Sequence, residues 1–175
     1  MNRARWEALA IALAVFVLDR GTKMWIEARV SVYDTIVVIP DVFNIVHTRN
    51  RGAAFGMLST APESVRLTVL VGLAVGILGL IAWMLWQATE EKKSSGEWMN
   101  RLALALVMGG AVGNLWDRIL KGSVTDFLQV FLGSYEWPSF NVADSAISVG
   151  AVLMACELIF HKEAPKDSTH VPKID

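Results

Sequence analysis

The chain alternates between long apolar stretches and shorter segments rich in polar residues. A membrane-spanning helix needs about 20 predominantly apolar residues. Four stretches meet or approach this requirement: 6–28, 67–86, 99–119 and 141–160. The second is the clearest, because its 20 residues include no charged side chain. The pattern therefore predicts an all-α membrane protein with four transmembrane helices, and the length of 175 residues predicts a single domain, 1–175.

The first stretch is the least regular of the four. Its uninterrupted apolar part, Ala8–Leu18, has only 11 residues, so a spanning helix must carry Asp19 and Lys23 into or near the membrane. Residues four apart lie on one helix face, so these two side chains can pair. The pair is either a structural ion pair near the interface or a sign that Asp19 faces the bundle interior and contacts substrate or the active site, and the spacing leaves both open. No small-residue cleavage site follows the apolar run, so we interpret it as a retained span.

Two segments, 29–66 and 120–140, connect the spans on one side of the membrane. In the first, Thr35–Ile39 and Val42–Thr48 are rich in Val, Ile and Phe, and Pro40-Asp41 separates them as a turn. We expect these runs to form a small β-element on the membrane face. For the second segment we expect a loop whose apolar side chains rest on the interface.

An even number of spans puts both termini on the other side, together with the polar turn Glu90–Glu97. Lysine and arginine are somewhat more frequent on that side, which modestly favours cytoplasmic termini and extracytoplasmic loops. The polar tail 162–175 is expected to be disordered.

Composition supports this interpretation and excludes several kinds of site. Hydrophobic residues make up 54% of the chain, and the mean hydropathy is +0.43. A net charge of −1 offers no basic surface for nucleic acid. The single cysteine, Cys156, excludes an intramolecular disulfide and a cysteine-based metal site. The three histidines lack ligand spacing, so we expect neither a metal nor another cofactor.

Glycines four residues apart occur in two of the predicted spans. Gly109 with Gly113 indicates close packing against another helix. For Gly72 with Gly76, packing against a neighbouring helix and the absence of such packing are equally compatible with the spacing.

The chemistry is concentrated between Gly109 and Asp144, near one membrane edge. Asn114 and Arg118 share a helix face because they are four apart, and so do Asn141 and Asp144, which are three apart. Asp126 lies in the short connection between these helices. Ionisable groups this close to hydrocarbon are costly, so their default interpretation is functional.

Two carboxylates brought to one site are the parts of an aspartic peptidase. Because they cannot both ionise cheaply at short range, they share one proton. The ionised member can take a proton from water while the protonated one polarises the scissile carbonyl. Spacing alone also allows Asp126 to be an ordinary loop residue and Asp144 to be an acid favoured by the helix dipole. A proton-coupled transporter using Asp19 and Asp144, or a non-catalytic lipid-binding or assembly protein, are the other classes considered.

Five blocks together resemble the lipoprotein signal peptidase (signal peptidase II) family, in the family's order. They are Asp19–Lys23, Asn50–Phe55, Gly109–Arg118, Val124–Phe127 and Phe140–Asp144. The resemblance implies a four-helix bacterial inner-membrane protein with a small extracytoplasmic β-cradle and an active site near the extracytoplasmic face. It also implies an aspartic endopeptidase that removes the signal peptide from prolipoproteins just before a diacylglyceryl-modified cysteine.

Residue roles and partners follow from the same resemblance. Asp126 and Asp144 correspond to the catalytic pair, and Asp117 to a structural support. The expected substrate-binding residues are Asp19, Asn50, Gly52, Asn114, Arg118 and Asn141. The expected partners are prolipoproteins, membrane lipids and the cyclic peptide antibiotic globomycin, and the expected state is a monomer.

Overall fold

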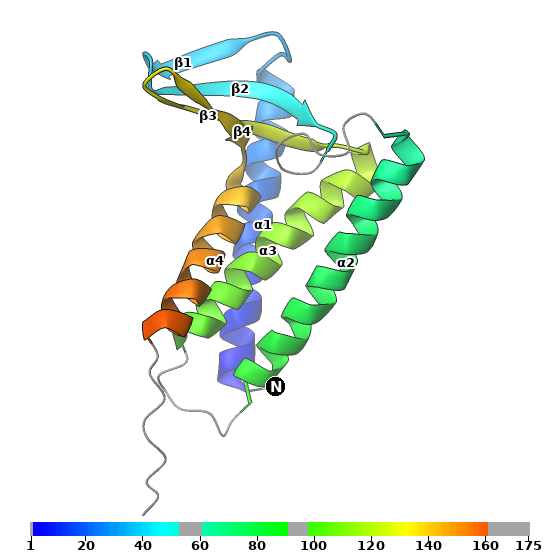
Figure 1. The fold of residues 1–175 in the computed structure, drawn as a ribbon, viewed down its shortest axis with the longest axis vertical. Helices are drawn as coiled ribbons and strands as arrows, with labels where there is room; N and C mark the ends of the chain where they lie inside the picture. Colours follow the sequence, from blue (N-terminus) through cyan, green and yellow to red (C-terminus); the bar gives the residue numbers. More distant parts are fainter. Residues whose placement is uncertain (1, 53–60, 91–97, 161–175) are drawn as a thin grey trace, which may run out of the picture.

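The computed structural model describes residues 2–52, 61–90 and 98–160. Within these residues a bundle of four helices carries a four-stranded antiparallel sheet at one end (Figure 1). The Asn50–Phe55 block is described only as far as Gly52, and the polar turn Glu90–Glu97 only at Glu90. The tail 162–175 lies outside the described residues. The elements, in chain order, are α1 Arg3–Arg29, β1 Thr35–Ile39, β2 Phe43–Asn50, α2 Glu63–Ala88, α3 Trp98–Lys121, β3 Val124–Leu132, β4 Tyr135–Phe140 and α4 Val142–Phe160.

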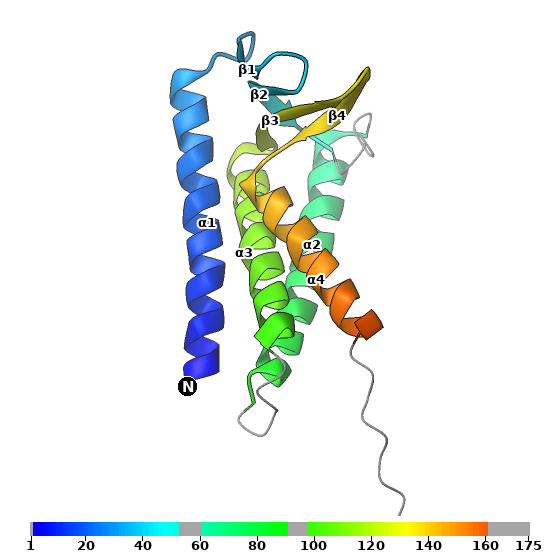
Figure 2. The ribbon, with the colours of Figure 1, turned by 90° about the vertical axis from the view of Figure 1, so that its left-hand side faces the viewer.

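Helix α3 is the centre of the bundle, because it packs against each of the other three helices (Figure 2). Small residues allow this close approach. A Cβ atom added to Gly109 would collide with Ala12 of α1, and one added to Gly110 would collide with the carbonyl oxygen of Ala143 on α4. Gly113 faces Asp19 of α1 in the same way. The packing predicted for Gly109 and Gly113 is therefore confirmed.

The glycines of α2 behave differently. A Cβ atom added to Gly72 or Gly76 would meet nothing within 4 Å in the described part of the chain. The packing that their spacing allowed is not found there.

Within the described ranges, three helices are long and apolar enough to cross a membrane: α2, α3 and α4. Helix α1 has 27 residues and lies alongside α3, but Asp19, Arg20 and Lys23 interrupt its apolar sequence. Its Leu9, Leu13 and Val17 are exposed on the outside of the bundle. The chain is thus a multi-pass membrane protein, and the fourth span stays a prediction.

The sheet has the strand order β1-β2-β3-β4. The first two strands are the β-element predicted for Thr35–Thr48, and the turn between them contains Asp41 in the left-handed region, at φ 60°.

The expectation of a loop over 120–140 was wrong, because this segment forms the hairpin β3–β4, which turns at Gly133. Strand β3 pairs along β2, with Val130 opposite Phe43, and this pairing between distant segments is not encoded in local spacing. Asp126 is accordingly a strand residue, which fixes its backbone more firmly than a loop would.

We expect alanine to be tolerated at Gly72 but not at Gly110. The methyl group in Gly110→Ala would collide with the carbonyl oxygen of Ala143 and lie 2.9 Å from Ile147 Cγ1, and such overpacking costs about 1–3 kcal/mol. Gly72→Ala adds its methyl group in open space, so the same helix-favouring change serves as the control. The measurement is the thermal unfolding midpoint of the purified protein in detergent. Equal midpoints for the two variants would contradict the packing described for α3.

Candidate active site

Asp126 and Asp144 meet where the sheet joins the bundle, although they come from different elements. Asp126 lies in β3 and is 2% exposed, whereas Asp144 lies half-buried in the first turn of α4. Asn141 connects them. Its Nδ2 donates to Asp126 Oδ1 at 2.7 Å, and its backbone N–H donates to Asp144 Oδ2 at 3.2 Å.

The same asparagine caps helix α4, which starts at the next residue, Val142. Its side-chain Oδ1 accepts a hydrogen bond from the backbone N–H of Asp144 at 2.9 Å, and Asp144 returns the bond to the backbone of Asn141. This reciprocal pairing three residues apart is the geometry of a capping box, with Asn and Asp in place of the usual residues. The helix start therefore fixes both the position and the orientation of the Asp144 carboxylate.

Asn114 of α3 adds a second connection. Its Nδ2 donates to Asp144 Oδ1 at 2.7 Å, and its Oδ1 accepts from Asn141 Nδ2 at 3.3 Å. Both oxygens of Asp144 are consequently engaged, one by α3 and one by the start of α4.

Asn50, the last residue of β2, holds Asp126 from the opposite side. Its Nδ2 donates to Asp126 Oδ2 at 3.1 Å, while its Oδ1 accepts from the backbone N–H of Gly52 at 3.1 Å. Gly52 thus orients Asn50, so that the amide group presents its donor to the carboxylate.

The electrostatics of Asp126 differ from those of an ordinary surface aspartate. Burial, and secondly the negative charge of Asp144, raise the pKa of Asp126 to about 6. The hydrogen bonds from Asn50 and Asn141 act in the opposite direction, because they stabilise the ionised form. Arg118 is close enough to interact with both carboxylates, and its Nη1 donates to the carbonyl oxygen of Asn114 at 3.4 Å. Two acids and one base therefore meet at this edge.

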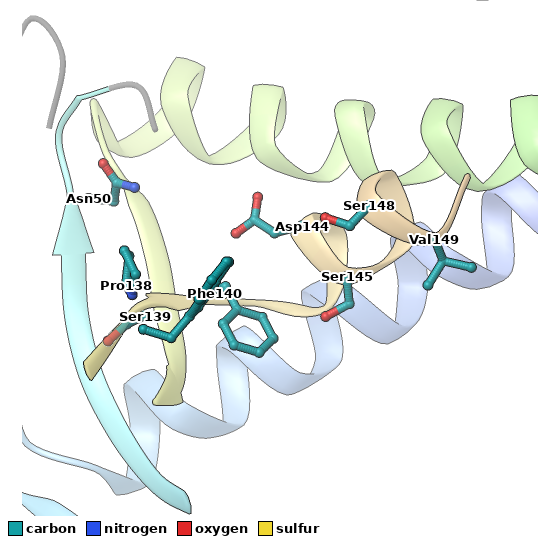
Figure 3. Close-up of a pocket in the computed structure, with 9 residues that line it drawn as sticks. Asn50, Pro138, Ser139, Phe140, Asp144, Ser145, Ser148 and Val149 are labelled. Atoms are coloured by element: carbon teal, nitrogen blue, oxygen red, sulfur yellow. The ribbon is translucent and has the colours of Figure 1, made fainter. Parts of the chain in front are cut away.

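A pocket of about 440 Å³ opens beside these residues. Figure 3 shows Asn50 at the end of β2 and Asp144 in the first turn of α4 bordering it, with Ser145 and Ser148 farther along the helix. The rest of its lining comes from β4 and α4: Trp137, Pro138, Ser139, Phe140 and Val149. The sequence did not single out these residues as site residues, because they are ordinary apolar and hydroxyl side chains with no distinctive spacing. The pocket thus offers one carboxylate and one amide among mainly apolar walls.

Asp19 and Asp117 lie away from this pocket. Both are fully buried between α1 and α3, where Lys23 contacts Asp19 at 2.8 Å and Asp117 at 3.0 Å. The predicted pairing of Asp19 with Lys23 is confirmed. Asp19 Oδ1 also accepts the backbone N–H of Ala143 at 3.0 Å, and Arg20 pairs with Asp117. The side chain of Asp19 faces the bundle interior, as one of the two interpretations held, but it has no exposed surface with which to meet a substrate.

Among the described residues, no group of three or more His, Cys, Asp or Glu side chains could hold a metal ion.

Comparison with known proteins agrees with the resemblance of the five blocks. The family model "Signal peptidase (SPase) II" matches residues 11–160. The lipoprotein signal peptidase of Solibacter usitatus is 47% identical over 159 residues, covering 91% of this chain and 94% of that protein. The lipoprotein signal peptidase of Geobacter sulfurreducens is 44% identical, covering 86% and 89%.

The fold is also found among solved structures. A bacterial membrane enzyme solved by the in meso method at 2.3 Å resolution superposes with a TM-score of 0.77 at 30% identity, covering 95% of this chain and 94% of that chain. A second such structure, at 1.9 Å resolution, has a TM-score of 0.75 at 30% identity, covering 89% of this chain and 94% of that chain. With its sequence matched over almost all of the helices and strands, the chain belongs to the signal peptidase II family.

Proposed function

We propose that Asp126 and Asp144 are the catalytic pair with which this lipoprotein signal peptidase removes the signal peptide from diacylglyceryl-modified prolipoproteins. Cleavage falls at the peptide bond just before the lipidated cysteine. One observation carries the assignment: a single residue, Asn141, bridges the two carboxylates with its side-chain amide and its backbone N–H, at the end of an apolar bundle and beside a pocket.

The two acids are suited to different parts of the reaction. Burial and the nearby charge of Asp144 favour the protonated form of Asp126, so Asp126 is the better acid to polarise the scissile carbonyl and protonate the leaving amine. Asp144 lines the pocket, where water and the substrate can reach it, so it is the better base to take a proton from the attacking water. Neither step needs a nucleophilic serine or cysteine.

The surrounding residues hold this arrangement in place. Asn50 and Asn141 each donate to one oxygen of Asp126, and Asn114 donates to Asp144. Asn50, which borders the pocket, can also meet the substrate backbone, and Gly52 keeps its amide oriented. Arg118 supplies the positive charge that offsets negative charge developing on the pair.

Asp19 and Asp117 are proposed as supports rather than as substrate contacts. Asp19 accepts the backbone N–H of Ala143, which fixes the first turn of α4 beside Asp144. Asp117 holds Arg20 and Lys23 in the same buried cluster.

The membrane arrangement that fits these roles has α1 as a fourth span. The sheet would then be an extracytoplasmic β-cradle, with both termini in the cytoplasm and the active site near the outer face of the inner membrane. Strand β3 and the first turn of α4, which contain Asp126 and Asp144, lie at the sheet end of the bundle and away from the N-terminus of α1 (Figure 1), which fits this arrangement.

The same pocket is the proposed site for the lipid-modified segment and for globomycin. Its apolar walls, including Trp137, Phe140 and Val149, suit acyl chains and apolar side chains, and membrane lipids would fill it otherwise. A monomer is sufficient for this reaction, because one chain provides both carboxylates.

Replacing either acid by its amide should abolish cleavage. Asp126→Asn and Asp144→Asn each remove the ability to share and pass one proton, so turnover of a diacylglyceryl-modified precursor should fall at least 1,000-fold, an order-of-magnitude expectation from loss of both acid and base function. The assay follows release of the signal peptide by detergent-solubilised protein. Asp41→Asn, the same chemical change in the β1–β2 turn, is the control and should remain active. Substantial turnover by either active-site variant would exclude this mechanism.

The raised pKa of Asp126 also predicts a pH-dependent stability. In the unfolded chain an aspartate has a pKa of about 4, against about 6 for folded Asp126. Between these values the folded state binds more protons at Asp126, so the contribution of this residue to stability is greatest below pH 4 and is lost as the pH rises to about 6. Two pKa units correspond to about 3 kcal/mol. Asp126→Asn lacks this ionisable carboxyl group, so its unfolding midpoint should rise relative to that of the unmodified protein between pH 4 and pH 7. A constant difference between the two midpoints would contradict the burial of an ionisable carboxyl here.

The two roles of Asn141 can be separated with two variants. Serine keeps a side-chain oxygen that caps α4 but is too short to reach Asp126, whereas alanine loses both functions. Asn141→Ser should keep the unfolding midpoint close to that of the unmodified protein, while Asn141→Ala loses about 1 kcal/mol of stability. Both should lose most of their activity, because Asp126 loses its 2.7 Å donor. Full activity in Asn141→Ser would mean that the bridge to Asp126 is dispensable.

A further inference from the structure

Lys23 is the one cation among the described residues whose side chain is fully buried and also touches an amide of the active site. Its Nζ lies 2.8 Å from Asp19 Oδ2, 3.0 Å from Asp117 Oδ2 and 3.0 Å from Asn114 Oδ1. An ammonium group has three N–H donors and no acceptor. Two of the donors form hydrogen bonds, with Asp19 and with Asn114, and Asp117 is an ion-pair partner of the ammonium group. Asn114 is also the side chain that contacts Asp144.

The contact with Lys23 helps to fix which way the Asn114 amide faces. Because an ammonium group can only donate, the amide oxygen of Asn114 must point toward Lys23. The amide NH₂ then points the other way, and it donates to Asp144 Oδ1 at 2.7 Å. The bond from Asn141 Nδ2 to Asn114 Oδ1 requires the same orientation.

We propose that Lys23 is a positioning residue of the active site, which acts through Asn114 to keep a hydrogen-bond donor directed at Asp144. Lys23 has no exposed surface and does not border the pocket, so it takes no part in the reaction itself. The inference rests on the proposed catalytic pair. It adds a role for a buried ionic cluster on α1 and α3, which does not touch the substrate.

Other charged groups near the pair do not replace this function. Asp126, on β3, bonds to Asn50 and Asn141 and not to Asn114. Arg118 donates to the backbone carbonyl of Asn114 rather than to its side chain. Arg20 and Lys121 both pair with Asp117, and neither contacts the side chain of Asn114. In the described part of the chain, Lys23 and Asn141 are the groups that donate to Asn114 Oδ1.

The test compares Lys23→Met with Arg20→Met. Each variant removes one positive charge from the same buried cluster, so both should unfold at lower temperature. Lys23→Met removes the shorter of the two hydrogen bonds to Asn114 Oδ1 and leaves the one from Asn141 at 3.3 Å, so the amide is held less firmly against Asp144 and kcat on a lipid-modified precursor should fall at least about tenfold. Arg20→Met should keep its kcat within about twofold, because the donor on Asp144 is unchanged. Each kcat is measured on folded protein separated by gel filtration, at a temperature well below both midpoints.

A double-mutant cycle identifies the route of the effect. When Asn114 is already alanine, there is no amide left to orient, so adding Lys23→Met should lower kcat by less than about twofold. A further loss of tenfold or more in that background, or equal kcat losses in Lys23→Met and Arg20→Met, would overturn the proposal and leave Lys23 with a purely structural role.

If Lys23→Met does not fold, the double variant Asp19→Leu/Lys23→Met removes both members of the buried ion pair and leaves no uncompensated charge between them. The same cycle with Asn114→Ala then applies, with the same two outcomes. Failure of this inference differs from failure of the proposed function. Unchanged kcat in the Lys23 variants, with inactive Asp126→Asn and Asp144→Asn, would reject only the role of Lys23.

Discussion

The structure depends on one constraint, which is that two carboxylates must be held close together at the edge of an apolar bundle. Neither can be left without hydrogen bonds there, because an unpaired charge is costly in a region of low dielectric. Asn141 meets most of this requirement by itself. Its side-chain oxygen caps α4 by accepting the backbone N–H of Asp144, and its own backbone N–H donates to the Asp144 carboxylate. Its Nδ2 donates to Asp126 on β3. The residue between the end of β4 and the start of α4 thus sets the geometry of the pair.

Much of the fold could be predicted from the apolar pattern, and the reasons are local. Residues 67–86 have no charge over a full membrane thickness, and α2 extends this range by a few residues at each end, to Glu63–Ala88. The strands Thr35–Ile39 and Phe43–Asn50 were indicated by β-branched residues on either side of Pro40-Asp41. The hairpin β3–β4 was missed because its partner is β2, about 80 residues earlier in the sequence. Local spacing cannot report such a pairing, so Val124–Leu132 appeared only as an apolar loop.

The site could be predicted in part for a related reason. Helical spacing brought Asn114 near Arg118 and Asn141 near Asp144, and both pairs are in contact. Spacing could not decide whether Asp19 contacts substrate, because a buried and a pocket-facing position are compatible with the same sequence. Nor could it identify Trp137 and Val149 as pocket residues, since their chemistry is that of any lipid-facing surface. Which polar residues meet is determined by the crossing of α1, α3 and α4, and that is a property of the packed bundle.

The charges of α1 have an explanation that its apolar sequence alone does not provide. Asp19, Arg20, Lys23 and Asp117 form a cluster of two acids and two bases, whose charges balance. Lys121, which also pairs with Asp117, is partly exposed and is balanced by Glu27. Two hydrogen bonds connect this cluster to the elements of the proposed active site: Asp19 accepts the backbone N–H of Ala143, and Lys23 donates to Asn114. Replacing the cluster with apolar side chains would make α1 a more regular span. It would also release the first turn of α4 and the amide beside Asp144. The interrupted hydrophobicity of the first helix is therefore explained by its contacts with the proposed active site, and not by membrane insertion.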